Sequence, residues 1–175
     1  MTDADTPEAR RRIADRIADD PGIHFNALVR ALDLAPGQVQ YHVRELLSTD
    51  RVVAESLYGR THYYPPDVDP RTRRALAVLR RETAADVAAV LAVEGPARPA
   101  AVAEDLGIAR STLEYHLDRM ESVGLVEKRR DERGRVTLAL PRPAETADLL
   151  DGTDPSLPAR MADRFERLVD GLLSE

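Results

Sequence analysis

The chain has 175 residues, a length that suits one medium domain or two small ones. It is 43% hydrophobic but only 4% aromatic and has no tryptophan, so alanine, leucine and valine must build the core, which favours small helical units. The lack of cysteine excludes disulfides, thiolate catalysis and cysteine-ligated metals. The first residues are acidic and then basic without an apolar segment, and no run approaches the length of a membrane span, so we expect a cytoplasmic protein without membrane contact.

The charge of the chain is abundant, at 32% of residues, and sums to −6. This sign counts against a nucleic-acid partner, because proteins that bind DNA are usually basic. Lys128 is the single lysine among 25 basic residues, and the acidic residues number 31. Such a lysine-poor, aspartate- and arginine-rich composition resembles that of proteins from salt-in halophilic archaea, although a GC-rich genome alone can supply part of it. On that interpretation the acidity is an adaptation to brine and carries no information about partners.

The first half of the chain predicts three helices followed by a hairpin. Ile13 and Ile17 mark the apolar face of the first helix, and Pro21-Gly22 ends it. The tight turn with the sequence DLAPG separates the second and third helices. β-prone residues then flank Gly59, which is typical of a hairpin tip, and Pro65 ends the second strand. The predicted helices span about residues 7–19, 25–32 and 36–48.

The second half predicts the same order of elements. The linker PPDVDP separates the halves, and residues 70–81 are predicted to extend the next helix backward into one long helix. Gly95-Pro96 and the turn GIARS then separate three helices, and a hairpin follows with Gly134 at its tip. A polar stretch after Pro141 leads to a final amphipathic helix. The predicted helices span about residues 82–93, 99–106, 110–122 and 158–173.

The dipeptide Tyr-His occurs in each half, at Tyr41-His42 and again 74 positions later at Tyr115-His116. At this offset residues 9–54 align with residues 83–128 without a gap, with few identities but with the apolar positions in register, which indicates one fold used twice. Three helices and a hairpin predict a winged helix-turn-helix. The fold class is therefore mainly α with small β-hairpin wings, a tandem duplicated winged helix-turn-helix plus a C-terminal amphipathic helix. The expected divisions are 1–65 for the first winged helix-turn-helix, 66–81 for a linker and helix extension, 82–141 for the second winged helix-turn-helix, and 142–175 for a polar linker and the C-terminal helix.

The stretch PGIHFNALVRALDLAPGQVQYHVRELLSTDRVV, with the later GRTHYYP, resembles archaeal transcriptional regulators with two winged helix-turn-helix domains. The resemblance covers residues 7 to about 65 closely and 82 to about 141 more loosely. The family's Gly-Leu-Val entry to the wing is kept as Gly124-Leu125-Val126, but the first copy has Asp50-Arg51-Val52 instead. The resemblance implies a DNA-binding regulator with double-stranded DNA as partner. It names neither a target gene nor an effector.

Tyrosine and histidine have different expected roles in the third helix of each copy. On a helical wheel Tyr41 lies nearly opposite the core positions Val39 and Val43, whereas His42 lies at the edge of the buried face. The histidine is expected to pack and to form a hydrogen bond there. Metal binding and catalysis have weak support, since the chain has no recurring carboxylate–histidine spacing, and we expect no cofactor. Two interpretations of the tyrosine stay open: a DNA contact, or a rim residue that covers the wing.

The candidate DNA-binding residues lie on the outward faces of the third helices and on the wings. Glutamine can pair with adenine and arginine with guanine, so the first copy is the expected base reader. In the second copy Glu114 and Asp118 repel phosphate, and its basic wing is either a clamp on the backbone or a solvated hairpin balanced by Glu127, Asp131 and Glu132. The first copy supplies Gly37, Gln38, Gln40, Tyr41, Arg44, Arg60, Thr61 and His62, and the second supplies Ser111, Thr112, Tyr115, Arg119, Lys128, Arg129, Arg130, Arg133 and Arg135.

The leading hypothesis is a sequence-specific transcription regulator, and the alternative is an adaptor whose winged helices bind protein in transcription or chromosome machinery. Nothing supports an enzyme, since the chain has no Gly-rich phosphate loop and no nucleophile–base arrangement. The C-terminal helix carries an apolar stripe, which predicts a homodimer, with folding back onto the winged-helix domains as the alternative. The stripe consists of Met161, Phe165, Leu168, Val169 and Leu172.

Overall fold

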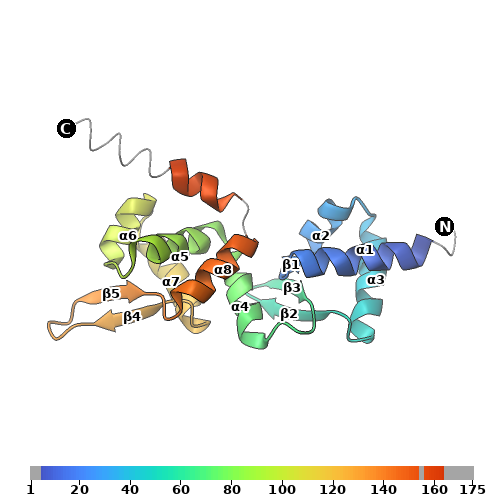
Figure 1. Cartoon of the computed structure of the whole chain (residues 1–175), viewed down its shortest axis with the longest axis horizontal. Coiled ribbons are helices and arrows are strands. Elements are labelled where there is room, and N and C mark those ends of the chain that lie inside the picture. The colour runs from blue at the N-terminus through green and yellow to red at the C-terminus, as the bar shows by residue number, and fades with distance from the viewer. Residues whose placement is uncertain (1–4, 154–155, 164–175) are drawn as a thin grey trace. The chain divides into compact units, whose positions relative to one another are not determined.

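A computed structural model describes residues 5–153 and 156–163 of the chain (Figure 1). The chain divides into two compact units, which are unit 1, Met1–Ala77, and unit 2, Val78–Glu175. Both are mainly helical, and each carries a small antiparallel sheet. None of the helices in these described ranges is long and apolar enough to cross a bilayer. The predicted fold class, two helix-turn-helix domains in tandem with hairpin wings, is confirmed.

Unit 1 contains three helices and a sheet with the strand order β1-β3-β2. Leu57 pairs with Arg60, so only Tyr58 and Gly59 form the turn of the hairpin. Both have positive φ, 49° and 80°, which matches the type I′ turn that suits the twist of a hairpin. The elements are α1 (Asp5–Asp19), β1 (Ile23–His24), α2 (Phe25–Leu32), α3 (Pro36–Ser48), β2 (Val53–Leu57), β3 (Arg60–Tyr64) and α4 (Pro70–Leu79), the last of which ends in unit 2.

The core of unit 1 forms where the apolar faces of its three helices meet. Ile13 and Ile17 of α1, Leu28 of α2, and Val39 and Leu46 of α3 are all fully buried. Burying each of these side chains stabilises the unit by about 1.5–3 kcal/mol relative to leaving it exposed. The periodicity that predicted these helices is the same periodicity that fills the core, which is why their bounds agree closely with the prediction.

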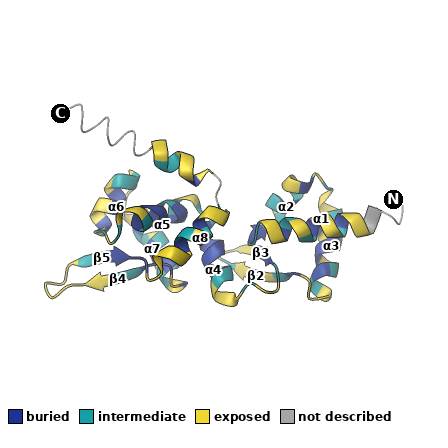
Figure 2. Cartoon of the chain, in the orientation of Figure 1, coloured by how far each residue is buried: buried dark blue, intermediate teal, exposed yellow. Residues whose placement is uncertain are grey.

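Unit 2 repeats this order of elements (Figure 1). Its wing pairs Arg130 with Val136, and the turn between them is exposed (Figure 2). A single bridge between Ala97 and Leu138 takes the place of the β1–β3 pairing. Neither β1 nor this bridge was predicted, because two residues are too few to show a strand pattern. The elements are α5 (Glu82–Glu94), α6 (Pro99–Leu106), α7 (Arg110–Ser122), β4 (Glu127–Arg130), β5 (Val136–Ala139) and α8 (Pro143–Thr153).

Equivalent positions of the two units share backbone conformations that the sequence alone does not show. Asp33 ends α2 with φ 51°, and Gly107 ends α6 with φ 61°. Asp50 has φ 54° before the first wing, and Gly124 has φ 72° before the second. Aspartate tolerates the left-handed region better than most residues. The departure from Gly-Leu-Val at Asp50 therefore leaves the entry to the wing unchanged.

The single long helix predicted to run through residues 70–81 into the next helix is wrong. α4 ends at Leu79, and Arg81 has an extended backbone (φ −92°, ψ 118°) as the residue before α5. Residues 75–79 of α4 and most of residues 84–91 of α5 are buried, so neither helix has one narrow apolar face whose interruption would reveal the break. Glu82 in the first turn of α5 is the available signal, because a carboxylate is favourable at a helix start.

The polar linker predicted after Pro141 is also wrong, because residues 143–153 form α8. Thr146 and Leu150, four residues apart, are buried, and α8 packs against α5. Pro143 at the first helical position and Glu145 in the first turn are helix-start signals that the sequence analysis missed. The apolar face was too narrow to stand out from its polar surroundings.

Candidate nucleic-acid interface

The outward face of α3 presents side chains that are free to meet a ligand. Gly37, Gln40, Tyr41 and Arg44 are exposed, and 54% of Tyr41 is accessible. Arg44 forms no ion pair with any described residue. Val39 and Leu46, on the opposite face of the same helix, hold these side chains outward by being fully buried.

Gln38 has a different environment from the rest of this face. Its side-chain oxygen accepts a hydrogen bond of 3.3 Å from the backbone N–H of Ala35, at the start of α3. A bidentate pair with adenine needs both the oxygen and the nitrogen of the amide. Gln38 therefore acts first as a helix cap, and Gln40 is the glutamine of this helix that stays available for a base.

The wing of unit 1 presents two of its three predicted contacts. Arg60 and Thr61 are exposed, and Thr61 Oγ1 lies 3.0 Å from Ser56 Oγ on the neighbouring strand. His62 is a correction, because it is only 4% exposed and its Nδ1 donates a 2.7 Å hydrogen bond to the carbonyl of Gly22. Side chains alternate between the faces of a strand, so the inward position of His62 follows from the outward position of Thr61.

The two Tyr-His pairs keep one geometry. The rings of Tyr41 and His42 lie 5.1 Å apart edge to face, as do the rings of Tyr115 and His116. His42 is buried, whereas His116 is half-buried, and burial together with the charge of Arg81 lowers the pKa of His116. Among the residues that the structure describes, no group of three histidine or acidic side chains could hold a metal ion. The pair belongs to the repeated fold, with histidine inward and tyrosine outward.

The outward face of α7 is neutralised from within unit 2. The ammonium of Lys128, on β4, lies 3.0 Å from Glu114, 3.1 Å from Glu121 and 3.9 Å from Asp118. The hydrogen bond from Lys128 lowers the pKa of Glu114. Burial alone would lower the pKa of Lys128, but its hydrogen bonds with Glu114 and Glu121 outweigh burial and raise it. Lys128 was predicted to contact DNA; the structure instead binds it to the carboxylates of the helix.

The remaining predicted residues of α7 are partly engaged as well. The guanidinium of Arg119 lies 3.6 Å above the ring of Tyr115, a cation–π contact that covers the exposed tyrosine. Arg110 lies 3.4 Å from Glu114. Ser111 and Thr112 are exposed at the start of the helix. This face therefore offers hydroxyl groups and few free cations.

The wing of unit 2 is less basic than its sequence indicates. Arg129 pairs with Glu127 at 2.5 Å, and Arg135 pairs with Asp131 at 2.6 Å. Asp131 also accepts hydrogen bonds from the backbone N–H groups of Arg133 and Arg135, and the Arg135 backbone bond is the main cause of its lowered pKa. Arg130 and Arg133 are exposed and form no ion pair with another described residue. These two arginines are the cations of the wing that stay available.

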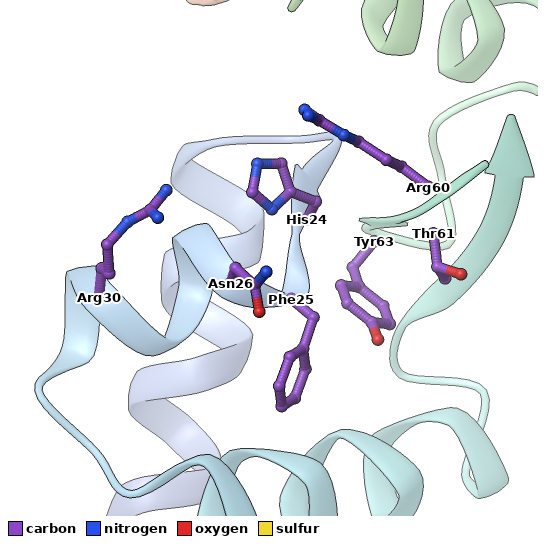
Figure 3. Close-up of a pocket in the computed structure, with 7 residues that line it drawn as sticks. All are labelled: His24, Phe25, Asn26, Arg30, Arg60, Thr61 and Tyr63. Carbon is purple, nitrogen blue, oxygen red and sulfur yellow. The ribbon is translucent and has the colours of Figure 1, made fainter. Parts of the chain in front are cut away.

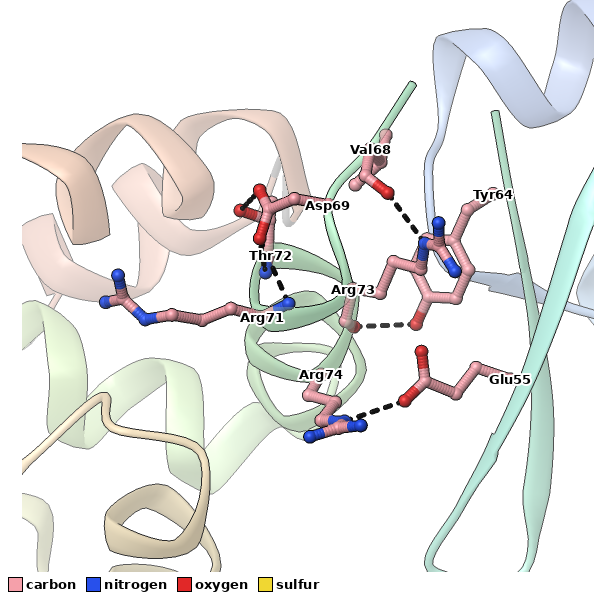
Figure 4. A network of polar contacts seen from close by, with 8 residues as sticks. All are labelled: Glu55, Tyr64, Val68, Asp69, Arg71, Thr72, Arg73 and Arg74. Atoms are coloured by element: carbon pink, nitrogen blue, oxygen red, sulfur yellow. Dashed lines mark hydrogen bonds and ion pairs between the residues drawn. The ribbon is translucent and has the colours of Figure 1, made fainter. Parts of the chain in front are cut away.

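Bonds within unit 1 hold the first wing against α4 (Figure 4). The hydroxyl of Tyr64 donates to the carbonyl of Arg73 at 2.7 Å, and Arg74 pairs with Glu55 of β2 at 2.8 Å. Asp69 caps α4 by accepting from the backbone N–H and the hydroxyl of Thr72, which lower its pKa. The strands of the wing are therefore tied to a helix as well as to each other.

The sequence analysis missed a cavity of about 530 Å³ at the start of α2. It is bounded by α2 and β3, with Arg30 and Arg60 on two sides of His24 (Figure 3). Tyr63 also lines it and is 8% exposed, and burial raises the pKa of its hydroxyl. Arg30 could have been found as an exposed cation near the turn, but only the fold brings it to Arg60. The lining consists of His24, Phe25, Asn26, Arg30, Arg60, Thr61 and Tyr63.

Most of the predicted dimerisation stripe lies outside the described residues, namely Phe165, Leu168, Val169 and Leu172. Its first member, Met161, is half-buried in a helical segment over residues 157–163. Leu157 of this segment is buried, and the guanidinium of Arg160 lies 3.0 Å from Asp86 on α5. The start of the C-terminal helix thus packs on its own unit.

Two family models match the chain. A model described as an N-terminal HTH domain (HTH_HVO_0163_N) matches residues 7–76, and a model described as a helix-turn-helix domain (HTH_20) matches residues 79–129. The chain is therefore a tandem helix-turn-helix protein. It is also 30% identical over 129 residues to the "Uncharacterized HTH-type transcriptional regulator MJ1398" of Methanocaldococcus jannaschii. That match covers 74% of this chain but only 32% of the relative's length.

Solved structures show weaker similarity. The transcriptional regulator Tm0710 from Thermotoga maritima has a TM-score of 0.37 at 18% identity, over 59% of this chain and 82% of that one. ScpB from Mycobacterium tuberculosis has a TM-score of 0.31 at 18% identity, over 78% of this chain and 92% of that one. Both TM-scores lie below 0.5, too low to assign a common fold to the whole chain.

Proposed function

We propose that this tandem helix-turn-helix protein is a sequence-specific DNA-binding transcription regulator in which unit 1 reads the bases and unit 2 contacts the backbone. The observation that carries the proposal is the free outward face of α3. Gln40 and Arg44 are exposed there, and Arg44 forms no ion pair with a described residue. These are the side-chain types that pair with adenine and guanine in the major groove.

In this proposal the first wing completes the contact of unit 1. Arg60 and Thr61 meet the backbone beside the groove that α3 enters, and Gly37 allows a phosphate to approach the start of the helix. Tyr41 contacts a phosphate or a thymine methyl from the same face. His62 and Gln38 have structural roles instead, as their hydrogen bonds indicate.

Unit 2 contributes mainly through its wing. Arg130 and Arg133 are exposed and without ion pairs among the described residues, so phosphate contact does not require them to leave a partner. Ser111 and Thr112 at the start of α7 add hydrogen bonds to the backbone. The rest of α7 stays out of the groove, because its carboxylates are bound to Lys128 and would repel phosphate.

A second candidate function is a protein-binding adaptor, and the neutralised face of α7 favours it. Tyr115, 50% exposed and covered by Arg119, is a side chain typical of protein interfaces. The net charge of −6 also weakens the attraction to DNA.

Genome-wide occupancy of the tagged protein in its host tests the proposal. A regulator gives narrow peaks that share a sequence motif upstream of transcription units. The matched control is the protein with Gln40→Ala and Arg44→Ala, which should lose the motif. Broad occupancy that follows other proteins and survives these two changes would favour the adaptor.

The homodimer remains a proposal, which rests on the apolar pattern of the sequence beyond Asp163. Two-fold symmetry suits a palindromic operator with half-sites one or more turns apart. Light scattering of the full chain and of a chain ended after Asp163 tests it, because Leu157 and Arg160 keep their contacts in both. Monomers in both samples at micromolar concentration and high salt would contradict the dimer.

A further inference from the structure

The cavity lined by Arg30 and Arg60 adjoins a second cavity beside α3. A second cavity of about 330 Å³ is lined by Phe25, Gln40, Val43, Arg44, Leu47 and Tyr63. It shares Phe25 and Tyr63 with the first cavity of about 530 Å³. The two cavities are therefore adjacent, and together they are called the unit 1 trench, with Arg30 and Arg60 in one part, Gln40 and Arg44 in the other, and the two aromatic residues in both.

The charge of the unit 1 trench has one sign. Arg30 and Arg60 lie at one end and Arg44 at the other, and none of the three forms an ion pair with a described residue. Among the residues that the structure describes, no aspartate or glutamate lines either part. Arginines that face a cavity without a counter-charge attract an anion, and the planar guanidinium suits the oxygens of a phosphate.

The middle of the trench is aromatic and holds an unused donor. In Figure 3 the rings of Phe25 and Tyr63 point away from the two arginines, toward the side of the recognition helix. Tyr63 is 92% buried, being 8% exposed, yet its hydroxyl has no hydrogen-bond partner among the described residues. The hydroxyl oxygen is not one of the buried side-chain atoms that lack a partner, so it is accessible at the cavity surface, where it can donate a hydrogen bond to a ligand oxygen.

We propose that the unit 1 trench seats one strand of the DNA sugar–phosphate backbone, next to the groove that α3 reads. The order basic, aromatic, basic matches the order phosphate, deoxyribose, phosphate along a strand. Arg30 and Arg60 bind one phosphate, Phe25 and Tyr63 contact the sugar, and the Tyr63 hydroxyl with Arg44 binds the next phosphate. The inference rests on the proposed function and adds Phe25, Arg30 and Tyr63 to its contacts.

The test uses the full chain and a duplex selected by the wild-type protein from random DNA. Arg30→Gln with Arg60→Gln should lower the slope of log affinity against log salt by about 0.9, since the two arginines bind one phosphate and each phosphate contact contributes about 0.9. Tyr63→Phe, which keeps the ring, should weaken binding about 3- to 10-fold. Arg11→Gln is the matched control, because Arg11 is exposed on α1, lines neither part of the trench, and should leave the slope unchanged.

Neutral methylphosphonate linkages, placed one at a time in the duplex, locate the contact. A neutral linkage at one or two adjacent positions should weaken DNA binding by the wild type. The same linkage should not weaken binding by the Arg30→Gln, Arg60→Gln protein any further. Unchanged salt slopes in the variants would overturn the inference while leaving base reading by α3 intact. The variants could instead lose binding of inorganic phosphate while no neutral linkage affects DNA binding. That result would make the trench a site for free anions and would also overturn the inference. Failure of the wild type to select any sequence would instead contradict the proposed function itself.

Discussion

The third helices of the two units, α3 and α7, share one pattern of buried positions and differ in the chemistry of their outward faces. Gln40 of α3 occupies the position of Glu114 in α7, and Arg44 occupies that of Asp118. Tyrosine and histidine are kept in both, with the same ring geometry. Burial keeps the inner positions apolar, whereas nothing in the fold dictates the outer ones. A duplicated fold therefore does not imply a duplicated function, which has to be argued for each face separately.

The largest expected difference concerns Arg44 and Asp118, the equivalent positions of the two helices. Arg44→Ala should remove about 1–3 kcal/mol of discrimination between the selected site and scrambled DNA, because a base contact is lost. Asp118→Ala should leave discrimination unchanged. Binding titrations on both duplexes measure it, and equal losses on selected and scrambled DNA would reduce Arg44 to a phosphate contact.

The wing of unit 2 should show the next largest effect, on salt dependence. Arg133→Gln should lower the log–log slope by about 0.9, because this arginine has no ion pair with a described residue. Arg135→Gln should change it less, since Arg135 is already bound to Asp131. Equal slopes for Arg133→Gln and the wild type would place the wing off the DNA and favour the adaptor.

The Lys128 cluster should make the stability of unit 2 depend on pH. The folded-state pKa of Glu114 is lowered, so its contribution is present above the ordinary value of 4.5 and is lost as pH falls through the folded pKa. The pKa of Lys128 is raised, so its contribution is complete below 10.5 and is lost as pH rises through the folded pKa.

Lys128→Met should remove the alkaline dependence and weaken the acid one, which Arg110 still supports, and should cost about 0.5–1 kcal/mol at neutral pH, a small figure because both side chains are partly exposed. Hydrogen exchange of α7 amides from about pH 3 to about pH 7, a range that includes the ordinary glutamate pKa of 4.5, measures the acid limb. The amides of α3 provide an internal control. Parallel acid profiles for the wild type and Lys128→Met would show that the cluster contributes nothing.

The smallest expected effect is on the backbone before each wing. Asp50→Gly should stabilise unit 1 by about 0.5 kcal/mol, and Gly124→Asp should destabilise unit 2 by a similar amount, because both positions have positive φ. A Cβ at Gly124 would meet no atom within 4 Å, so the expected cost comes from the positive φ of the backbone and not from a clash. Urea unfolding measures the change in the free energy of unfolding for each variant. The prediction requires an increase for Asp50→Gly and a decrease for Gly124→Asp.

The sequence predicted the helices that contain the core because apolar periodicity and burial are the same signal. It failed at the break between α4 and α5, where both helices are buried on most sides, and at α8, where the buried face is reduced to Thr146 and Leu150. It also predicted the outward direction of Tyr41 and Arg44 correctly.

The sequence could not show which charges are already paired. Lys128 and Arg135 look alike in a basic stretch, and only folding brings Glu114 and Asp131 to them. The unit 1 trench was hidden for the same reason, because Arg30 and Arg60 lie 30 residues apart in the sequence and line one cavity only in the folded chain.

The most direct test of the central claim is selection from random DNA with three proteins: the wild type, the Gln40→Ala, Arg44→Ala protein, and the matched Glu114→Ala, Asp118→Ala protein. We expect the wild type and the α7 variant to enrich the same motif. The α3 variant should enrich no motif while it still binds DNA at low salt. A motif that survives the α3 changes and is lost with the α7 changes would show that unit 2 reads the bases, and would contradict the account.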